Sequence, residues 1–198
     1  MSYTREQVEA AVKSKGYVYF EDVNNKGFDV NIVGIRNSST GQKVTNAFDD
    51  QITLSYKENG EWRFHSWPAT TDPGKKGVLE YHNAAGVARL VEGQYRGSHG
   101  IGLHQGKYEA LKQAKNVKVY RDANKDLNYD ENKIAEGVFG MNIDKAGADS
   151  TYVENWSEGC QVFKKSADFE EFMKICRKAR DTHGNSFTYT LIESTDIK

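Results

Sequence analysis

The stretch ITLSYKENGEWRFHSW, residues 52–67, decides the fold class. Its two halves are rich in β-branched and aromatic residues, which favour strands. The Asn59-Gly60 pair between them is a strong local signal for a two-residue hairpin turn, because both residues tolerate a positive φ. We therefore predict a hairpin with strands at 52–56 and 62–67, within a mainly β protein.

Further strand-like runs lie on both sides of this hairpin. Clusters of Gly, Asn, Ser and Thr separate them, as expected for turns. The segment 67–95 is otherwise irregular, which is typical of loops that build a site. The additional predicted strands are residues 17–20, 28–36, 88–95, 117–120, 138–144, 159–163 and 186–193.

Three segments carry helical signals. A capping-box pattern that begins at Thr4 and precedes an apolar stripe predicts a helix over residues 4–15. Good helix formers predict a second helix over 107–114, and the apolar spacing after Ser166 predicts a third over 166–180. The predicted fold class is therefore mainly β, with two or three peripheral helices.

The length and charge of the chain limit its organisation and partners. At 198 residues, it is long enough for one domain with a buried core. We expect residues 1–49 to pack as an N-terminal helix and strands on a larger unit, residues 50–198. The formal net charge of −1 gives no field that attracts nucleic acid. No apolar stretch approaches the roughly 20 residues that a membrane-spanning helix needs. We expect neither a nucleic-acid partner nor a membrane span.

The N-terminus and the cysteines bear on the compartment. Met1 leads directly into a predicted helix, without the basic and apolar regions of a signal peptide, so we expect a leaderless product made in the cytoplasm. Cys160 and Cys176 are too few for a disulfide framework, although a single disulfide between them stays open. Cys176 lies in a helical pattern, where a small buried hydrophobe is expected.

Cys160 is the candidate chemical centre, within NWSEGCQVF, residues 155–163. It follows Gly159 at the end of a loop and begins a predicted strand, so its sulfur can be presented at a sheet edge. A cysteine nucleophile needs such exposure, a base or cation that lowers the thiol pKa, and amides that stabilise an oxyanion. Ser157 and Gly159 complete the predicted catalytic loop. Taken alone, the pattern also fits a buried structural cysteine.

The order of several short motifs resembles the L,D-transpeptidase (YkuD-type) catalytic domain. WPATTDPG, residues 67–74, is similar to the threonine-proline-glycine segment of that family, and SEGC, residues 157–160, is similar to its Ser-His-Gly-Cys signature. Segment 138–144 stands where the family has a strand that ends in its catalytic histidine. The resemblance covers about residues 50–192.

This resemblance implies a cysteine enzyme of the bacterial cell wall, with a β-sandwich or sheet core and peripheral helices. Members of the family attack a carbonyl between an L-centre and a D-residue in a peptidoglycan stem peptide. They form an acyl-enzyme, which an amine or water then resolves. Carried over, Cys160 is the nucleophile, and the amides of Gly159 and Cys160 are candidate oxyanion donors. Such catalysis requires no cofactor.

Three positions depart from the pattern of the family. Asp144 stands in place of the general-base histidine, Glu158 replaces the histidine of the signature, and Val162 stands where Arg or Asn is usual. An aspartate with a pKa of about 3.9 is a poor acceptor for the proton of a thiol with a pKa of about 8.5, and its charge raises the thiol pKa. Asp144 can replace imidazole only if it is strongly desolvated.

A histidine elsewhere could act as the base, and RGSHGIGLHQG, residues 96–106, offers two. His104 is preferred to His99, because its flanking glycines allow close backbone approach and a helix is predicted to start at Lys107. His104 could instead satisfy a backbone group within a loop. The residues that we expect to contact substrate are His99, Trp156, Glu158 and Gln161.

Acidic and amide side chains alternate along DANKDLNYDE, residues 122–131. Oxygen ligands at alternate positions of a tight loop match the first part of an EF-hand-like calcium loop. The match is incomplete, because Leu127 replaces the glycine of the sharp turn and Lys133 replaces the closing glutamate. Glu131 or another residue would have to complete the ligand shell, and the alternative is a solvated acidic turn. The candidate Ca²⁺ ligands are Asp122, Asn124, Asp126, Asn128 and Asp130.

Three functions follow from these patterns. The first is a peptidoglycan-directed cysteine peptidase or transpeptidase acting at the cell wall. Without a leader, such an enzyme would suit a bacteriophage lysis or virion component. The second is a binding or structural module that keeps the fold but has lost the chemistry, as Asp144 and Glu158 suggest. The third is a calcium-dependent, adhesin-like domain. The oligomeric state and the choice between hydrolysis and transpeptidation stay open.

Overall fold

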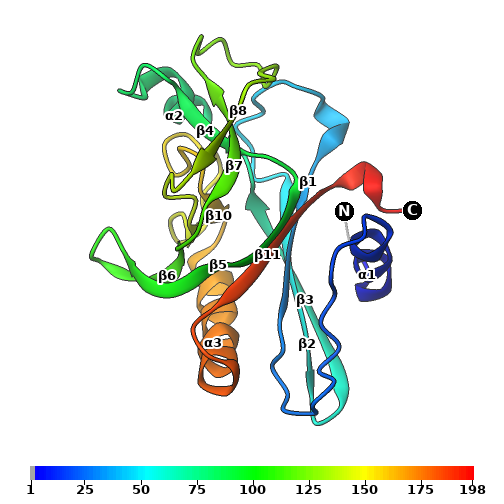
Figure 1. Ribbon diagram of the computed structural model, residues 1–198. Helices are drawn as coiled ribbons and strands as arrows, with labels where there is room; N and C mark the ends of the chain where they lie inside the picture. Colours follow the sequence, from blue (N-terminus) through cyan, green and yellow to red (C-terminus); the bar gives the residue numbers. More distant parts are fainter. Residues whose placement is uncertain (1–2) are drawn as a thin grey trace.

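The computed structural model describes residues 3–198, which form a closed eight-stranded barrel and a smaller three-stranded sheet (Figure 1). The strand order around the barrel is β1-β11-β5-β6-β9-β10-β3-β2, and the small sheet has the order β4-β7-β8. Within the described residues there are three α-helices, so the prediction of a mainly β chain with two or three helices is confirmed.

The elements have the following bounds. The barrel strands are β1 (Asn31–Arg36), β2 (Asp50–Glu58), β3 (Glu61–Thr70), β5 (Gly93–His104), β6 (Tyr108–Gln113), β9 (Ile143–Lys145), β10 (Gln161–Phe163) and β11 (Phe187–Glu193). The small sheet consists of β4 (Val87–Leu90), β7 (Val117–Asp122) and β8 (Ile134–Gly137). The helices are α1 (Arg5–Ser14), α2 (Lys75–Glu80) and α3 (Ser166–His183), with 3₁₀ turns at Ser38–Thr40 and Ser194–Asp196.

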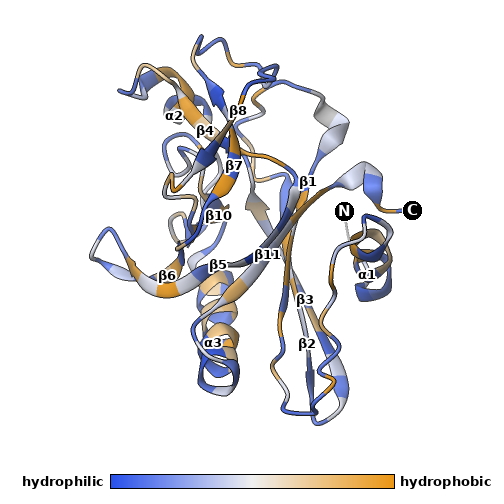
Figure 2. Ribbon diagram, viewed as in Figure 1, coloured by the Kyte–Doolittle hydropathy of each residue, from blue (hydrophilic) through white to orange (hydrophobic). Residues whose placement is uncertain are grey.

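The β2–β3 hairpin forms as predicted. Its antiparallel register runs without interruption to the Glu58–Glu61 pair. Asn59 and Gly60 close the turn with φ values of 53° and 80°, the mirror-image geometry that matches the right-handed twist of the strands. The tip of the hairpin is hydrophilic, whereas its strands carry hydrophobic stretches where they cross the middle of the molecule (Figure 2).

β1 lies between β11 and β2, and both of its faces are buried. Ile32 faces the main core, whereas Val33 and Ile35 pack with the apolar stripe of α1 on the other side. This double burial explains an almost continuous apolar run in a barrel strand. The boundary that we expected after residue 49 falls between β1 and its partner β2, so the N-terminal segment contributes a barrel strand.

α3 supplies much of the main core. Its Phe172 meets Trp67 edge to face at 6.0 Å, and Phe169 meets Phe163 at 5.6 Å between ring centroids. The predicted helix is confirmed, but Ser166 does not cap it. The hydroxyl of Ser166 donates to the carbonyl oxygen of Gly147 at 2.7 Å, and Lys165 occupies the cap position. No helix within residues 3–198 is long and apolar enough to cross a membrane.

The predicted helix over 107–114 is wrong, because this segment forms strand β6. β6 pairs with β5 from Tyr108 opposite His104 to Gln113 opposite His99. Ala110 and Leu111 are fully buried in the barrel core. Helix propensity is a weak local preference of a few tenths of a kcal/mol per residue, and cross-strand packing overrides it here.

Several other boundaries differ from the predictions. Segment 138–144 is a strand only from Ile143 onward, 17–20 is not a strand, and residues 98–104, predicted as loop, belong to β5. Strand β8 and helix α2 were not predicted. Helix α2 is held by hydrogen bonds with residues 46, 154 and 157, which are distant in sequence. The end of β5 pairs with the adjacent strand β6. The confirmed elements are α1 with its Thr4 capping box, β7, α3 and β11.

Candidate active site

The parallel pairing of β9 and β10 brings Cys160 beside Asp144. Val162 pairs with Asp144 and Gln161 with Ile143, so the residue that precedes β10 reaches the buried aspartate. The carboxyl group of Asp144 makes a hydrogen-bonding contact with the thiol of Cys160. The single thiol proton can be directed either to Asp144 or to the carbonyl oxygen of Gly140, which lies 3.3 Å from Sγ. Two strand ends from different parts of the chain therefore create the thiol–carboxyl pair.

His104 contacts the same aspartate. Its Nδ1 is 3.2 Å from Oδ2 of Asp144. Asp144 thus contacts both the cysteine and the histidine, and the three side chains form a row, Cys160–Asp144–His104. The preferred histidine of the sequence prediction is in the site, but it reaches the thiol through the aspartate.

The β5–β6 turn places His104. The residues between the strands are Gln105 and Gly106, with φ values of 48° and 71°, which close a tight hairpin. The amide of Lys107 donates to the carbonyl oxygen of His104 at 2.9 Å. His104 is therefore the last residue of a strand, not part of a loop before a helix, and the barrel wall fixes its position.

Burial favours the neutral forms of all three groups in the row. It raises the pKa of Asp144 to about 8 and lowers the pKa of His104, to which Lys112 and Lys107 contribute by repulsion. Burial, and then the charge of Asp144, raise the pKa of the Cys160 thiol well above its usual value. At neutral pH the row consequently contains a thiol, a carboxylic acid and an imidazole.

Asn142 sets the tautomer of His104. The backbone amide of Gln113 donates to Oδ1 of Asn142 at 2.9 Å, so Nδ2 of Asn142 must be the atom that lies 3.2 Å from Nδ1 of His104. Because Nδ2 is a donor, Nδ1 carries a lone pair and the ring proton resides on Nε2. Nδ1 can therefore accept a proton from Asp144.

The irregular segment 138–141 is fixed by two buried side chains from the barrel. Oε1 of Gln113 accepts hydrogen bonds from the amides of Phe139 and Met141 at 3.0 and 2.9 Å. Nε2 of His99 donates to the carbonyl oxygen of Met141 at 2.8 Å. His99 is only 1% exposed, and burial lowers its pKa to about 4. His99 therefore supports the segment that carries Gly140, in place of the expected contact with substrate.

The predicted catalytic loop is tied together by its own polar groups. Oγ of Ser157 donates to the carbonyl oxygen of Cys160 at 2.7 Å and accepts from the amide of Gly159 at 3.2 Å. Because this amide is engaged, Gly159 is not a free oxyanion donor, and only the amide of Cys160 is left from the expected pair. Gln161 is buried, donates to the carbonyl oxygen of Gly159 at 3.1 Å, and accepts from the Tyr189 hydroxyl at 2.9 Å. Ser157 and Gln161 therefore hold the loop rather than contact substrate.

A cleft of about 410 Å³ opens beside the row. Trp156, half exposed, and Tyr108 give it aromatic surface, and Lys107 and Lys145 give it positive charge. Glu158 is exposed on the same loop but is not one of the lining residues. The residues that line the cleft are His104, Gln105, Lys107, Tyr108, Asp144, Lys145, Asn155 and Trp156.

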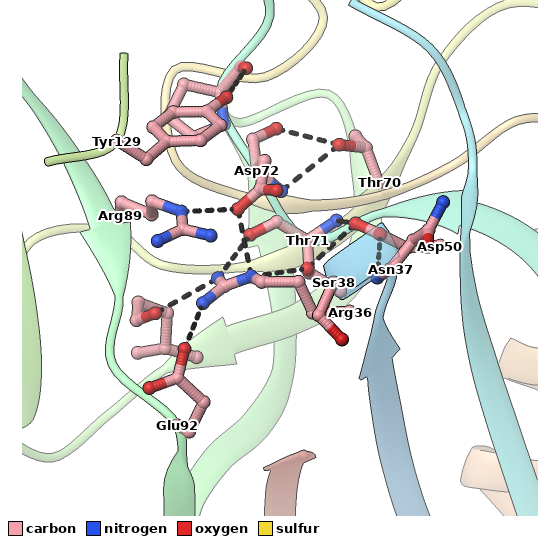
Figure 3. A network of polar contacts seen from close by, with 12 residues as sticks. Arg36, Asn37, Ser38, Asp50, Thr70, Thr71, Asp72, Arg89, Glu92 and Tyr129 are labelled. Carbon is pink, nitrogen blue, oxygen red and sulfur yellow. Dashed lines mark hydrogen bonds and ion pairs between the residues drawn. The ribbon is translucent and has the colours of Figure 1, made fainter. Parts of the chain in front are cut away.

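A buried polar network, missed by the sequence analysis, clamps the chain after β3 (Figure 3). Arg36, 1% exposed, lies 2.9 Å from Oδ1 of Asp72 and 2.8 Å from Oε1 of Glu92, and it donates to the hydroxyl and the carbonyl oxygen of Thr71. Asp50 accepts from the amide and hydroxyl of Thr71 at 2.6 and 2.8 Å. An arginine at the end of a mostly apolar strand was the available signal, because a buried charge must be paired.

This network supports the catalytic loop. The segment that it clamps continues to Gly74, whose amide donates to the carbonyl oxygen of Ser157 at 2.9 Å. The hydroxyl of Tyr129 donates to the carbonyl oxygen of Pro73 at 2.6 Å. The end of the stretch 67–74 is therefore hydrogen-bonded to the loop that carries Cys160.

The acidic loop 122–131 does not gather its predicted ligands around one point. Oδ1 of Asn124 accepts from the amide of Asp126, and Oδ1 of Asp126 accepts from the amide of Asn128. Within residues 3–198, no group of three or more His, Cys, Asp or Glu side chains is arranged to hold a metal ion. Leu127 does adopt the positive φ, 66°, that a glycine would provide in the sharp turn. Asp130, near the end of the loop, is exposed.

Both cysteines are free thiols, so the disulfide that the sequence left open does not form. Cys176 is fully buried, as expected, and burial raises its pKa far above the usual range. Cys160 is partly exposed and contacts Asp144, which lines the cleft, although Cys160 is not itself one of the lining residues.

No protein-family model, no curated protein and no solved structure matches this chain.

Proposed function

We propose that this protein is a cysteine-dependent enzyme that acts on peptidoglycan stem peptides through an acyl-enzyme on Cys160. The observation that carries the proposal is the Cys160–Asp144–His104 row beside the cleft. The order of the motifs around Cys160 supports an L,D-transpeptidase-like enzyme, and membership of that family is part of the proposal. A bacteriophage lysis or virion role would bring such an enzyme to the wall.

The row suggests how the thiol is activated. Cys160 gives its proton to Asp144 as sulfur bonds to the substrate carbonyl carbon, and Asp144 gives its own proton to Nδ1 of His104. Asp144 stays neutral overall, and the imidazolium balances the negative charge on the carbonyl oxygen. When the leaving amine departs, it takes the proton back through the row. Water or an acceptor amine then repeats these steps in the opposite direction.

The charges of the cleft favour an acidic peptide. Lys107 and Lys145 lie on its walls, and the only acid that lines it, Asp144, is neutral at pH 7. A substrate carboxylate would therefore meet positive charge without repulsion. Trp156 and Tyr108 offer surface for the apolar parts of the peptide. Stem peptides, which carry free carboxylates, fit this environment.

The test is digestion of purified sacculi, followed by mass analysis of the released muropeptides. The wild type should release or exchange stem-peptide residues, and Cys160→Ala should not. Cys176→Ala is the matched control, because it removes the other thiol far from the cleft and should stay active. Equal product release by the wild type and Cys160→Ala would refute the nucleophile.

A second candidate function is binding without catalysis. The observation in its favour is the raised pKa of Cys160, which leaves little thiolate at neutral pH. In that case Cys160→Ala would bind stem peptides as tightly as the wild type, and the wild type would form no adduct with a carbapenem-like electrophile. Turnover gained by Asp144→His in an inactive wild type would identify a decayed enzyme.

A further inference from the structure

One carboxyl oxygen of Asp122, at the end of β7, and one of Glu131 lack hydrogen-bond donors. The other oxygen of Asp122 accepts from the amide of Lys125 at 2.7 Å. Oδ2 of Asp122 and Oε1 of Glu131 are the only buried side-chain nitrogen or oxygen atoms without a partner in the part of the chain that the structure describes. Asp122 is 3% exposed, and its carboxyl group lies against that of Glu131. Buried polar atoms are nearly always partnered, so this pair requires an explanation.

The surroundings make the pair more negative. Asp126 and Asp130 add repulsion at Asp122, and Asp130 does so at Glu131. The neighbouring cations are directed elsewhere. Nζ of Lys125 donates to the carbonyl oxygen of Tyr81, and Arg89 pairs with Asp72. The carboxyl groups of Asp122 and Glu131 therefore lie together, and the nearby acids make their surroundings more negative.

We propose that Ca²⁺ binds between the carboxylates of Asp122 and Glu131. Calcium prefers carboxylate, amide and carbonyl oxygens in a flexible shell of six to eight ligands, about 2.3–2.6 Å from the ion. Asp122 and Glu131 supply the two charged ligands. The remaining positions fall to main-chain oxygens of the loop and to water. Glu131 replaces the closing glutamate that the sequence pattern lacks.

The site is accessible and connected to the fold. Glu131 lines a cleft of about 280 Å³, which gives an ion a path from solvent. Tyr129, two residues before Glu131, is buried and donates to the carbonyl oxygen of Pro73. Because the loop is docked in this way, an ion that holds it stabilises the folded chain as a whole, and bound Ca²⁺ raises the melting temperature.

The test is thermal unfolding of the chelator-treated full chain, with and without millimolar Ca²⁺. The wild type should melt several degrees higher with Ca²⁺. Tb³⁺ bound at the site should show luminescence sensitised by Tyr129, and added Ca²⁺ should abolish this luminescence by displacing Tb³⁺. Glu131→Gln should melt no lower than the wild type without the ion, because repulsion is relieved, but it should lose both responses. Asp122→Asn should lose them as well.

Glu136→Gln is the matched control, because Glu136 is exposed on the neighbouring strand β8, and this variant should respond as the wild type does. The proposal is overturned if Ca²⁺ leaves the wild-type melting temperature unchanged, which would mean that the two carboxyl groups share a proton. It is also overturned if Glu131→Gln keeps the full response, or if Mg²⁺ at the same concentration gives an equal shift.

Discussion

Replacing Asp144 with asparagine should make the thiol of Cys160 more acidic. Asp144 titrates near pH 8, whereas the pKa of Cys160 lies well above its usual value, so Asp144 is already charged when the thiol ionises. Two unit charges about 4 Å apart interact by about 4 kcal/mol at an effective dielectric constant of about 20. One pKa unit corresponds to about 1.36 kcal/mol, so Asp144→Asn can lower the thiol pKa by about 3 units.

The assay is the rate of alkylation of Cys160 as a function of pH, in a Cys176→Ala background so that only one thiol reports. Asp149→Asn is the control, because it removes a negative charge from an exposed surface residue and should leave the profile unchanged. The result predicted for Asp144→Asn is an alkylation profile displaced to lower pH. If the profile coincides with that of the Cys176→Ala protein that keeps Asp144, the electrostatic account of the thiol is refuted.

The same variant separates acidity from catalysis. Asparagine cannot accept the thiol proton and pass another to His104, so Asp144→Asn should alkylate faster and yet release less product from sacculi. If alkylation and turnover rise together, Asp144 acts only as a repulsive charge and the proposed proton bridge is wrong.

Three further changes have expected outcomes. The folded state keeps the proton of Asp144 up to about pH 8 and the unfolded state releases it near about pH 3.9, so this group favours folding at low pH and its contribution is lost as pH rises. Urea unfolding at pH 5 and pH 8 should show a stability loss of about 4 kcal/mol that is missing in Asp144→Asn. Gly159→Ala places a Cβ 2.3 Å from the carbonyl oxygen of Ala88, at a φ of 132°. It should lower the melting temperature far more than Gly184→Ala, because Gly184, with a φ of 95°, has no atom within 4 Å of the added Cβ. Equal losses in the two variants would contradict this. Gln113→Leu leaves the amides of Phe139 and Met141 unpaired, at a cost of about 1–3 kcal/mol each. Hydrogen exchange of these two amides should accelerate.

Local chemistry was sufficient for part of the fold. The Asn59-Gly60 turn, the capping box at Thr4 and the apolar face of α3 each depend on residues close together in sequence, and each is present in the structure. Cys160 could also be singled out, because a loop glycine and a following strand are local features. Tertiary partners decided where such elements begin and end, as β6 shows.

The site itself depended on pairings between distant strands. Asp144 looked like a loss of function in the sequence, since an exposed aspartate is a carboxylate at neutral pH. Only the parallel β9–β10 pairing brings it against Cys160, and only the β6–β9 pairing brings the β5–β6 hairpin, with His104, to the same aspartate. The sequence by itself singled out the residues of the proposed site. The closed barrel decided their neighbours and their protonation, because the pKa of a side chain is set by desolvation and by charges that are close in space rather than along the chain.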